Sequence, residues 1–223
     1  MEDVLDLYTA PYDPLRPLVC FDETTKQLIG ESPTRAPLPV APGLPGRVDY
    51  EYIRNGVSNL FMFFAPLSNW REVVVTAHRT KVEFAYCMRD IVDRYFPDAV
   101  LIRVVMDNLN THDLSALYEV FEPVEARRII SKLEIHYTPK HGSWLNMAEI
   151  ELSVLSKQCL DRRIPDEVSL AVETGGWVCE RNTAKATVEW RFTTADARIK
   201  LKKLYPTIKA QHPLLTQDLP NAA

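Results

Sequence analysis

The sequence predicts an α/β fold in which a mixed sheet of about five strands is flanked by helices. Two observations support this fold class. Three apolar, β-type segments come before the first long helical segment, and strand-like and helix-like segments alternate after it. Consecutive strands usually pair antiparallel, whereas strands joined through a helix usually pair parallel. We therefore expect a sheet that is antiparallel in its first part and parallel in its second.

The first three strands are expected at residues 17–23, 59–66 and 71–79. The first is a short apolar run that ends in two acids, and the other two are joined by the turn at 67–70, which predicts a hairpin. Residues 31–47 separate the first strand from the hairpin and contain five prolines. Proline neither donates to a strand ladder nor continues a helix, so this segment is predicted to be an extended, exposed loop.

Helices and strands alternate from this point on. A helix over 81–96 follows the capping residue Thr80 and leads to a buried strand at 98–108. The next helical segment, 113–131, is interrupted by a proline, and a fifth strand is expected at 133–138. A loop and one further apolar helix complete the predicted α/β unit.

The chain is expected to divide into three parts. Residues 17–160 form the α/β domain, residues 1–16 a linker or extension, and residues 161–223 a helical C-terminal extension. The extension carries predicted helices at 165–182 and 193–206, the second with a basic far end that suits the helix dipole.

Composition excludes several classes of protein. The net charge of −4 argues against a stand-alone nucleic-acid binder, which usually carries a basic excess. The longest apolar run, 60–67, is too short to span a bilayer, and the acidic N-terminus lacks the order of a signal peptide. The four cysteines form no C-x-x-C pair, so neither a zinc site nor a disulfide framework is indicated. We expect a cytoplasmic protein with no membrane partner.

Three acids lie at the ends of predicted apolar elements. Asp22 and Asp107 each close a strand, and Glu149 lies in the first turn of the helix after the fifth strand. Ligands of open α/β sheets bind in the crevice beyond the strand ends, and neighbouring carboxylates repel one another unless cations bridge them. Hard divalent ions relieve this repulsion, and two of them can stabilise both oxygens of a phosphodiester displacement. The three acids thus predict metal-assisted phosphoryl transfer.

The third acid is open in two respects. Glu149 could cap its helix instead of binding a metal ion, and Glu151 could be the ligand in its place. Glu149 lies three residues after Asn146, as in a helix-capping box. Glu151 is a second candidate ligand, because on a helical wheel both glutamates flank the apolar face and the periodicity does not choose between them. The small residues Ser153 and Ser156 share the side of Glu149 and leave room for a metal ion and DNA.

Three segments carry a family resemblance. These are VCFDET, VVMDNLNTH and HYTPKHGSWLNMAEIELSVL, which contain the three acids in order. They resemble the catalytic core of bacterial insertion-sequence transposases of the mariner-like superfamily, and the similarity extends from about residue 17 to residue 206. The family pattern Leu-Asn-x-x-Glu favours Glu149 over Glu151 as the third acid.

The resemblance implies a ribonuclease H-like fold and a DDE endonuclease and strand transferase that cuts transposon ends and joins them to target DNA. It implies two Mg²⁺ ions, with Mn²⁺ as a substitute. Asp22 would bridge both ions, and Asp107 and Glu149 would each hold one. The Asp107–Glu149 separation, 149 − 107 = 42 residues, exceeds the spacing usual in much of the superfamily, which fits an enlarged helical insert between them.

Seven further residues are predicted to contact DNA or to orient a water or phosphate beside the acids. Their amide, cationic, imidazole and indole side chains suit phosphate contact and base stacking. They are Asn108, His112, Lys140, His141, Trp144, Arg162 and Arg163.

The expected partners also follow from the resemblance. Double-stranded DNA would be the substrate, and a homodimer would form with residues 31–47 as a clamp-like loop on the partner subunit. The first acid lies about 20 residues from the start of the sequence, so a helix-turn-helix DNA-reading region is expected on a separate N-terminal polypeptide or region. A bacterial, nucleoid-associated location would follow.

Two other functions remain open at this stage. A catalytically silent transposase remnant could still bind DNA or a full-length transposase. The segment FDETT loosely resembles the aspartate loop of haloacid dehalogenase-like phosphatases, but these need a second Asp two positions after the first, where this sequence has Thr24.

Overall fold

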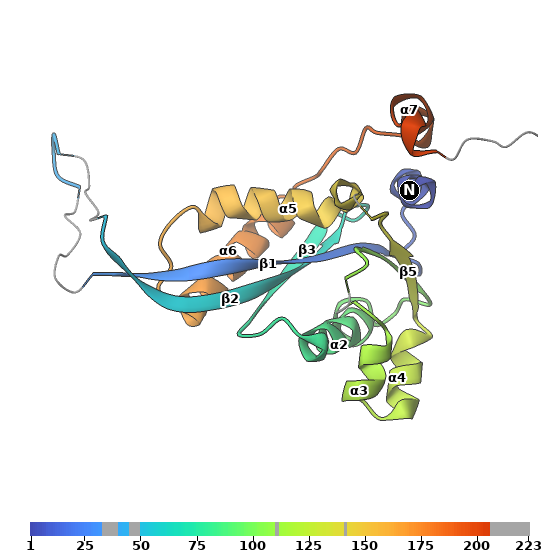
Figure 1. Ribbon diagram of the computed structural model, residues 1–223, viewed down its shortest axis with the longest axis horizontal. Coiled ribbons are helices and arrows are strands. Elements are labelled where there is room, and N and C mark those ends of the chain that lie inside the picture. The colour runs from blue at the N-terminus through green and yellow to red at the C-terminus, as the bar shows by residue number, and fades with distance from the viewer. Residues whose placement is uncertain (33–39, 45–49, 110–111, 141, 206–223) are drawn as a thin grey trace, which may run out of the picture.

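The computed structural model describes residues 1–32, 40–44, 50–109, 112–140 and 142–205. Five strands form one sheet in the spatial order β3-β2-β1-β4-β5 (Figure 1). β1 pairs antiparallel with β2, which pairs antiparallel with β3, whereas β4 lies parallel to both β1 and β5. The predicted division into an antiparallel and a parallel part is therefore confirmed. The strands are β1 (Leu18–Glu31), β2 (Tyr52–Ala65), β3 (Trp70–Thr76), β4 (Ile102–Met106) and β5 (Leu133–Tyr137).

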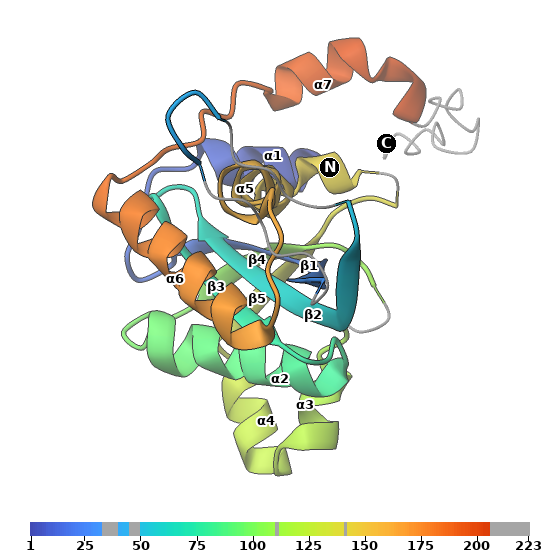
Figure 2. The ribbon, with the colours of Figure 1, turned by 90° about the vertical axis from the view of Figure 1, so that its left-hand side faces the viewer.

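Helices cover both faces of the sheet (Figure 2). α2, α3 and α4 lie on one face, while α1, α5 and α6 lie on the other, and α7 packs beside α1. α2 and α5 each continue into a short π-helical segment. The helices are α1 (Glu2–Thr9), α2 (Lys81–Asp90), α3 (Ser115–Val120), α4 (Pro123–Ile130), α5 (Met147–Leu155), α6 (Glu167–Thr183) and α7 (Thr194–Lys200).

The alternation of side chains along β1 assigns its residues to two separate apolar layers. Leu18 and Cys20 pack in the layer under α1, α5 and α6, whereas Val19 and Phe21 pack in the layer over α2, α3 and α4. Successive strand residues point to opposite faces. The same alternation directs Asp22 toward the α5 face and the next residue, Glu23, toward the α2 face.

The first two strands are longer than predicted. β1 does not end at Glu23 but continues to Glu31, and β2 begins at Tyr52, so the two strands extend beyond the sheet as a two-stranded arm (Figure 1). Pairing with β2 satisfies the backbone hydrogen bonds of this mostly polar stretch, in which Leu28 enters the core, so an apolar pattern does not reveal the length of the strand. The register shifts in this arm where Gly56 has a φ of 104°, a conformation that glycine adopts without strain.

The two ends of the described chain add to the core. Val4, Leu5 and Tyr8 of α1 pack in the same apolar layer as Leu170 and Trp177 of α6. The segments 1–16 and 161–205 are therefore joined through the core rather than attached loosely. Of the proline-rich loop at 31–47, residues 33–39 and 45–47 lie outside the described residues, so its predicted role stays a prediction. None of the described helices is both long and apolar enough to cross a membrane.

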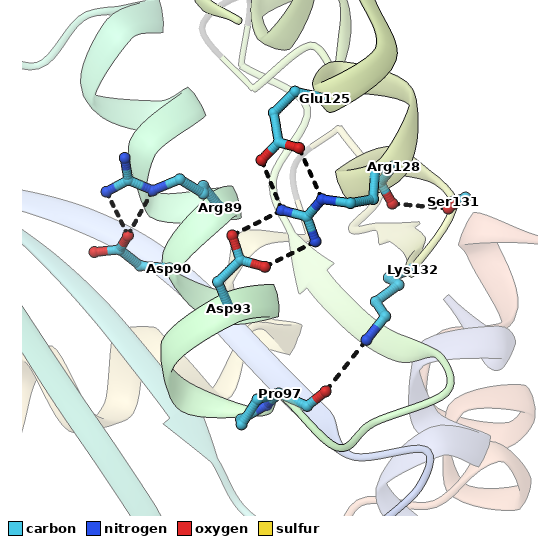
Figure 3. A network of polar contacts seen from close by, with 8 residues as sticks. All are labelled: Arg89, Asp90, Asp93, Pro97, Glu125, Arg128, Ser131 and Lys132. Atoms are coloured by element: carbon cyan, nitrogen blue, oxygen red, sulfur yellow. Dashed lines mark hydrogen bonds and ion pairs between the residues drawn. The ribbon is translucent and has the colours of Figure 1, made fainter.

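An exposed ion-pair network ties α4 to the end of α2 (Figure 3). The Arg128 guanidinium donates two hydrogen bonds to Asp93 and two to Glu125, at distances of 2.7–2.8 Å. About 40% of each of these side chains is exposed, at 42% for Arg128, 39% for Asp93 and 41% for Glu125. Solvent screens such a pair, so its contribution to stability is expected to be small.

Candidate active site

Strand register brings Asp22 and Asp107 to the same place. Cys20 of β1 pairs with Val105 of β4, and each aspartate lies two residues further along its strand direction. Asp22 therefore leaves the sheet on the face covered by α5, whereas Asp107, one residue past the end of β4, has its Oδ1 2.6 Å from His112 Nδ1. β1 itself continues past Asp22, but its parallel pairing with β4 ends at Cys20. The crevice beyond β4 thus opens beside Asp22, as expected for an α/β sheet.

The carboxylate of Asp22 is half-buried among other acids. Burial raises the pKa of Asp22 to about 7, although the hydrogen bond donated by the Glu23 N–H acts in the opposite direction. The negative charges of Glu23, Asp107 and Glu149 raise this pKa further, which means that all three act on Asp22 at close range. A carboxylate whose pKa is raised by neighbouring negative charges favours a bound cation.

Asn146 connects the start of α5 to this cluster. Its side-chain oxygen accepts a hydrogen bond from the Ala148 N–H, which makes it the N-cap of the helix. Its side-chain Nδ2 donates to Phe21 O at 2.8 Å and to Asp22 Oδ2 at 3.3 Å. The sequence predicted the cap but not the second role. Asn146 therefore fixes the first turn of α5, and with it Glu149, against β1.

The structure separates the two glutamates of α5. Glu151 is fully buried, and its Oε1 lies 2.8 Å from Arg181 Nη2 and 3.5 Å from Arg71 Nη2. Glu149 is half-buried on the side that faces Asp22. The capping-box interpretation of Glu149 is wrong, because the Asn146 N–H donates to Ser143 O instead. Of the two glutamates, Glu149 is thus the one that the structure leaves near Asp22.

His112 is buried rather than available to DNA. Only 2% of this residue is exposed, and its Nε2 lies 2.8 Å from Glu23 Oε2 while its Nδ1 lies 2.6 Å from Asp107 Oδ1. Burial alone would lower the pKa of His112, but the contacts with Asp107 and Glu23 outweigh it and raise the pKa to about 9. The predicted DNA contact is therefore corrected: the imidazole joins two acids inside the protein.

Two of the other predicted contacts lie beside Asp107. Asn108 and Lys140 are exposed and line, with Asp107, Thr138 and Ser143, a pocket of about 560 Å³. An amide and a cation next to the acids are suited to contact a phosphate. This pocket is the candidate place for the backbone of a nucleic acid.

The remaining predicted contacts differ in their surroundings. Trp144 is 42% exposed and stacks on Trp190 with ring centroids 6.4 Å apart. Arg162 forms an ion pair with Glu173, and Arg163 lies 2.7 Å from Glu31. Both arginines are thus paired within the protein. His141 lies outside the described residues.

The acids suit a hard cation but do not converge on one point. Carboxylate oxygens are the ligands that Mg²⁺ and Mn²⁺ prefer. Within the described residues, no three His, Cys, Asp or Glu side chains come close enough together to hold a single metal ion as they stand. The raised pKa of Asp22 nevertheless shows that Asp107 and Glu149 act on it through space. The donor chemistry and the charge of the site therefore fit the expected ions.

Comparison with known proteins identifies the class. Residues 17–171 match the family described as DDE superfamily endonuclease, and the chain belongs to this family. A search of curated protein sequences finds no match.

The fold matches solved structures of Mos1 transposase. A paired-end complex with the left transposon end is 14% identical with a TM-score of 0.52, over 82% of this chain and 56% of the other. The Mos1 strand transfer complex is 12% identical with a TM-score of 0.50, over 82% and 54%. A pre-cleavage Mos1 transpososome is 13% identical with a TM-score of 0.50, over 85% and 61%. The predicted ribonuclease H-like fold is thereby confirmed, and the chain spans little more than half the length of these relatives.

Proposed function

We propose that this chain is the catalytic domain of a DDE transposase, a metal-dependent DNA endonuclease and strand transferase that cuts transposon ends and joins them to target DNA. One observation carries the proposal: β1, β4 and α5 bring Asp107 and Glu149 within electrostatic range of Asp22 at one sheet edge. Membership of the DDE endonuclease family supports it. So does the similarity in fold to Mos1 structures solved with a transposon end and as a strand transfer complex.

The three acids would hold two Mg²⁺ ions, with Mn²⁺ as a substitute. When bound, the ions supply Lewis-acid stabilisation of the attacking and leaving oxygens. Asp22 lies on β1, which pairs with β4 and contacts α5, and both Asp107 and Glu149 act on its carboxylate, so it would be the residue suited to contact both ions. Asn146 keeps the Asp22 carboxylate in place through its 3.3 Å hydrogen bond, and Lys140 and Asn108 lie where a DNA phosphate would enter.

The wider assembly is part of the same proposal. Double-stranded transposon-end and target DNA are the substrates, and the active form is a homodimer in which residues 31–47 contact the partner subunit. A helix-turn-helix region reads the terminal repeats from a separate polypeptide or region. We place the protein in a bacterial cytoplasm, associated with the nucleoid, as part of an insertion sequence. The modest net charge of −4 is consistent with specific DNA reading by another region.

Nicking of supercoiled plasmid DNA by the purified chain tests the proposal. We expect nicking that requires Mg²⁺ or Mn²⁺ and falls at least about 10³-fold in Asp107→Asn, because several kcal/mol of transition-state stabilisation are lost with a metal ligand. Nicking that survives Asp107→Asn would contradict the proposed site. A folded chain that binds DNA but nicks it with neither metal, even with transposon-end DNA added, would favour the silent remnant.

Replacing Glu149 by Gln tests the assignment of the third acid. We expect the loss of metal-dependent nicking to be similar to that of Asp107→Asn, with little change in the melting temperature, because Glu149 is half-buried and removing its charge reduces the repulsion at Asp22. The measurements are the nicking rate and thermal unfolding followed by circular dichroism. Glu173→Gln on α6 is the control, since Glu173 forms an ion pair with Arg162 at the surface. Full activity in Glu149→Gln would remove it from the site.

A further inference from the structure

His112 is buried and connects Glu23, the neighbour of Asp22, with Asp107. Its Nδ1 lies 2.6 Å from Asp107 Oδ1 and 3.3 Å from Asp107 O, and its Nε2 lies 2.8 Å from Glu23 Oε2. The side chains of His112 and Glu23 are each 1% exposed, whereas that of Asp107 is 26% exposed. An imidazole faces carboxylate oxygens with both nitrogens only when both can donate. The ring therefore connects a buried acid to an acid at the site.

The imidazole ring is held by its neighbours as well as by the two acids. It stacks on Phe84 with ring centroids 5.2 Å apart and meets Phe21 edge-on at 5.5 Å. Its backbone is also fixed, because the His112 N–H donates to Leu109 O and His112 O accepts from the Tyr137 hydroxyl. A ring constrained on its faces and at its backbone has one orientation, so it offers Asp107 a donor in a fixed direction.

Asp107 needs such a partner because of its place in the chain. β4 ends at Met106, so Asp107 is the first residue of a loop and no strand partner restricts it. His112 Nδ1 meets Oδ1 as an ion-pair contact at 2.6 Å and hydrogen-bonds Asp107 O at 3.3 Å, so the ring holds both the backbone and one carboxylate oxygen of Asp107, while Oδ1 keeps its hydrogen-bonding capacity. Replacing a residue that orients a metal-binding side chain commonly changes metal affinity or activity about 10–100-fold. We expect an effect of about this size for His112.

We propose that His112, itself held by Glu23, is a positioning residue that directs the Asp107 carboxylate toward its metal ion. The proposal rests on the proposed function, since it takes Asp107 as a metal ligand. Arg79 contacts the other oxygen of Glu23, with Nη1 3.8 Å from Oε1 and 45% of its side chain exposed.

A second histidine of the same chain provides a matched control. His136 on β5 also contacts two acids, with Nδ1 2.6 Å from Asp3 Oδ2 and Nε2 3.2 Å from Glu134 Oε1. These acids are 66% and 37% exposed and neither belongs to the site. Replacing His136 thus removes the same kind of contact without touching Asp107.

The experiment measures Mn²⁺ binding to the metal-free chain by titration calorimetry, without DNA, together with the melting temperature. We expect His112→Ala to weaken Mn²⁺ binding about 10–100-fold and His112→Asn to restore part of the loss, because the amide keeps a donor near the position of Nδ1. Glu23→Gln should also weaken binding, and His136→Asn should not. If His112→Ala does not fold, the Mn²⁺ affinities of His112→Asn and Glu23→Gln test the proposal.

The outcomes separate this inference from the proposed function. Wild-type Mn²⁺ affinity in folded His112 and Glu23 variants, with affinity lost in Asp107→Asn, overturns the positioning role alone. A melting temperature that falls while the affinity stays unchanged gives His112 a purely structural role and also overturns it. Equal Mn²⁺ binding by the wild type and Asp107→Asn overturns the proposed function, and the positioning role with it.

Discussion

Asp22→Asn is expected to abolish metal-dependent DNA cleavage and to stabilise the metal-free protein at pH 8. Under the proposed function Asp22 would contact both ions, so its loss would remove several kcal/mol of transition-state stabilisation, and we expect a rate loss of at least about 10³-fold. The gain in stability has a separate origin. Asp22 is half-buried among Glu23, Asp107 and Glu149, and its charged form is unfavourable in the folded protein. An amide of the same shape removes that charge.

The sign of the pH dependence follows from the raised pKa. The unfolded chain releases the Asp22 proton near its ordinary pKa of 3.8, whereas the folded protein holds it until about pH 7. The folded state therefore binds more protons between these values, and stability falls as the pH rises through this window. His112 acts in the same direction at higher pH, because its pKa is raised from 6.5 to about 9 and its stabilising contribution is lost through that range.

Thermal unfolding at several pH values measures the effect. After allowance for the partial exposure of Asp22, we expect Asp22→Asn to gain about 2 kcal/mol at pH 8, or about 4–8 °C in melting temperature, and to lose the decline between pH 4 and 7. The exposed Asp161→Asn serves as control. If the melting temperature of Asp22→Asn at pH 8 is equal to or lower than that of the wild type, the charged form of Asp22 does not destabilise the folded protein.

Glu151→Gln is expected to cost about 3–5 kcal/mol of folding free energy. Glu151 lies between Arg71 and Arg181, and the side chains of Glu151 and Arg71 are both 0% exposed. Burial lowers the pKa of Arg71, whereas the negative charge of Glu151 raises it. Without that charge, two guanidinium groups would face each other with little solvent to screen them. Equilibrium denaturation in urea measures the loss.

Glu125→Gln provides the exposed counterpart. Glu125 also contacts an arginine, Arg128, which keeps Asp93 as a second partner (Figure 3). Because these side chains are about 40% exposed, at 41% for Glu125, the expected cost is below about 1 kcal/mol. Equal losses in Glu151→Gln and Glu125→Gln would show that burial does not strengthen the inner network.

Several features of the fold were predictable because they depend on neighbours in sequence. Thr80 forms a capping box with Glu83, and Asn146 and Thr193 cap their helices as residue type suggests. Apolar segments and their order were enough to predict the division of the sheet. The length of β1 was not predictable from apolar content, because its second half is mostly polar and pairs with β2, with Leu28 as its core residue.

The sequence by itself determined the class of fold, the three candidate acids and most helix starts, since these depend on residue type and spacing over a few positions. Tertiary structure decided which glutamate of α5 is left near Asp22. Glu151 meets Arg71, 80 residues away, and Arg181, 30 residues away, and so becomes part of the core, while Glu149 is left beside Asp22. It also decided that His112 lies between Asp107 and Glu23, which is 89 residues away from His112 in the sequence. Periodicity describes one element at a time, whereas burial and charge pairing depend on which elements meet.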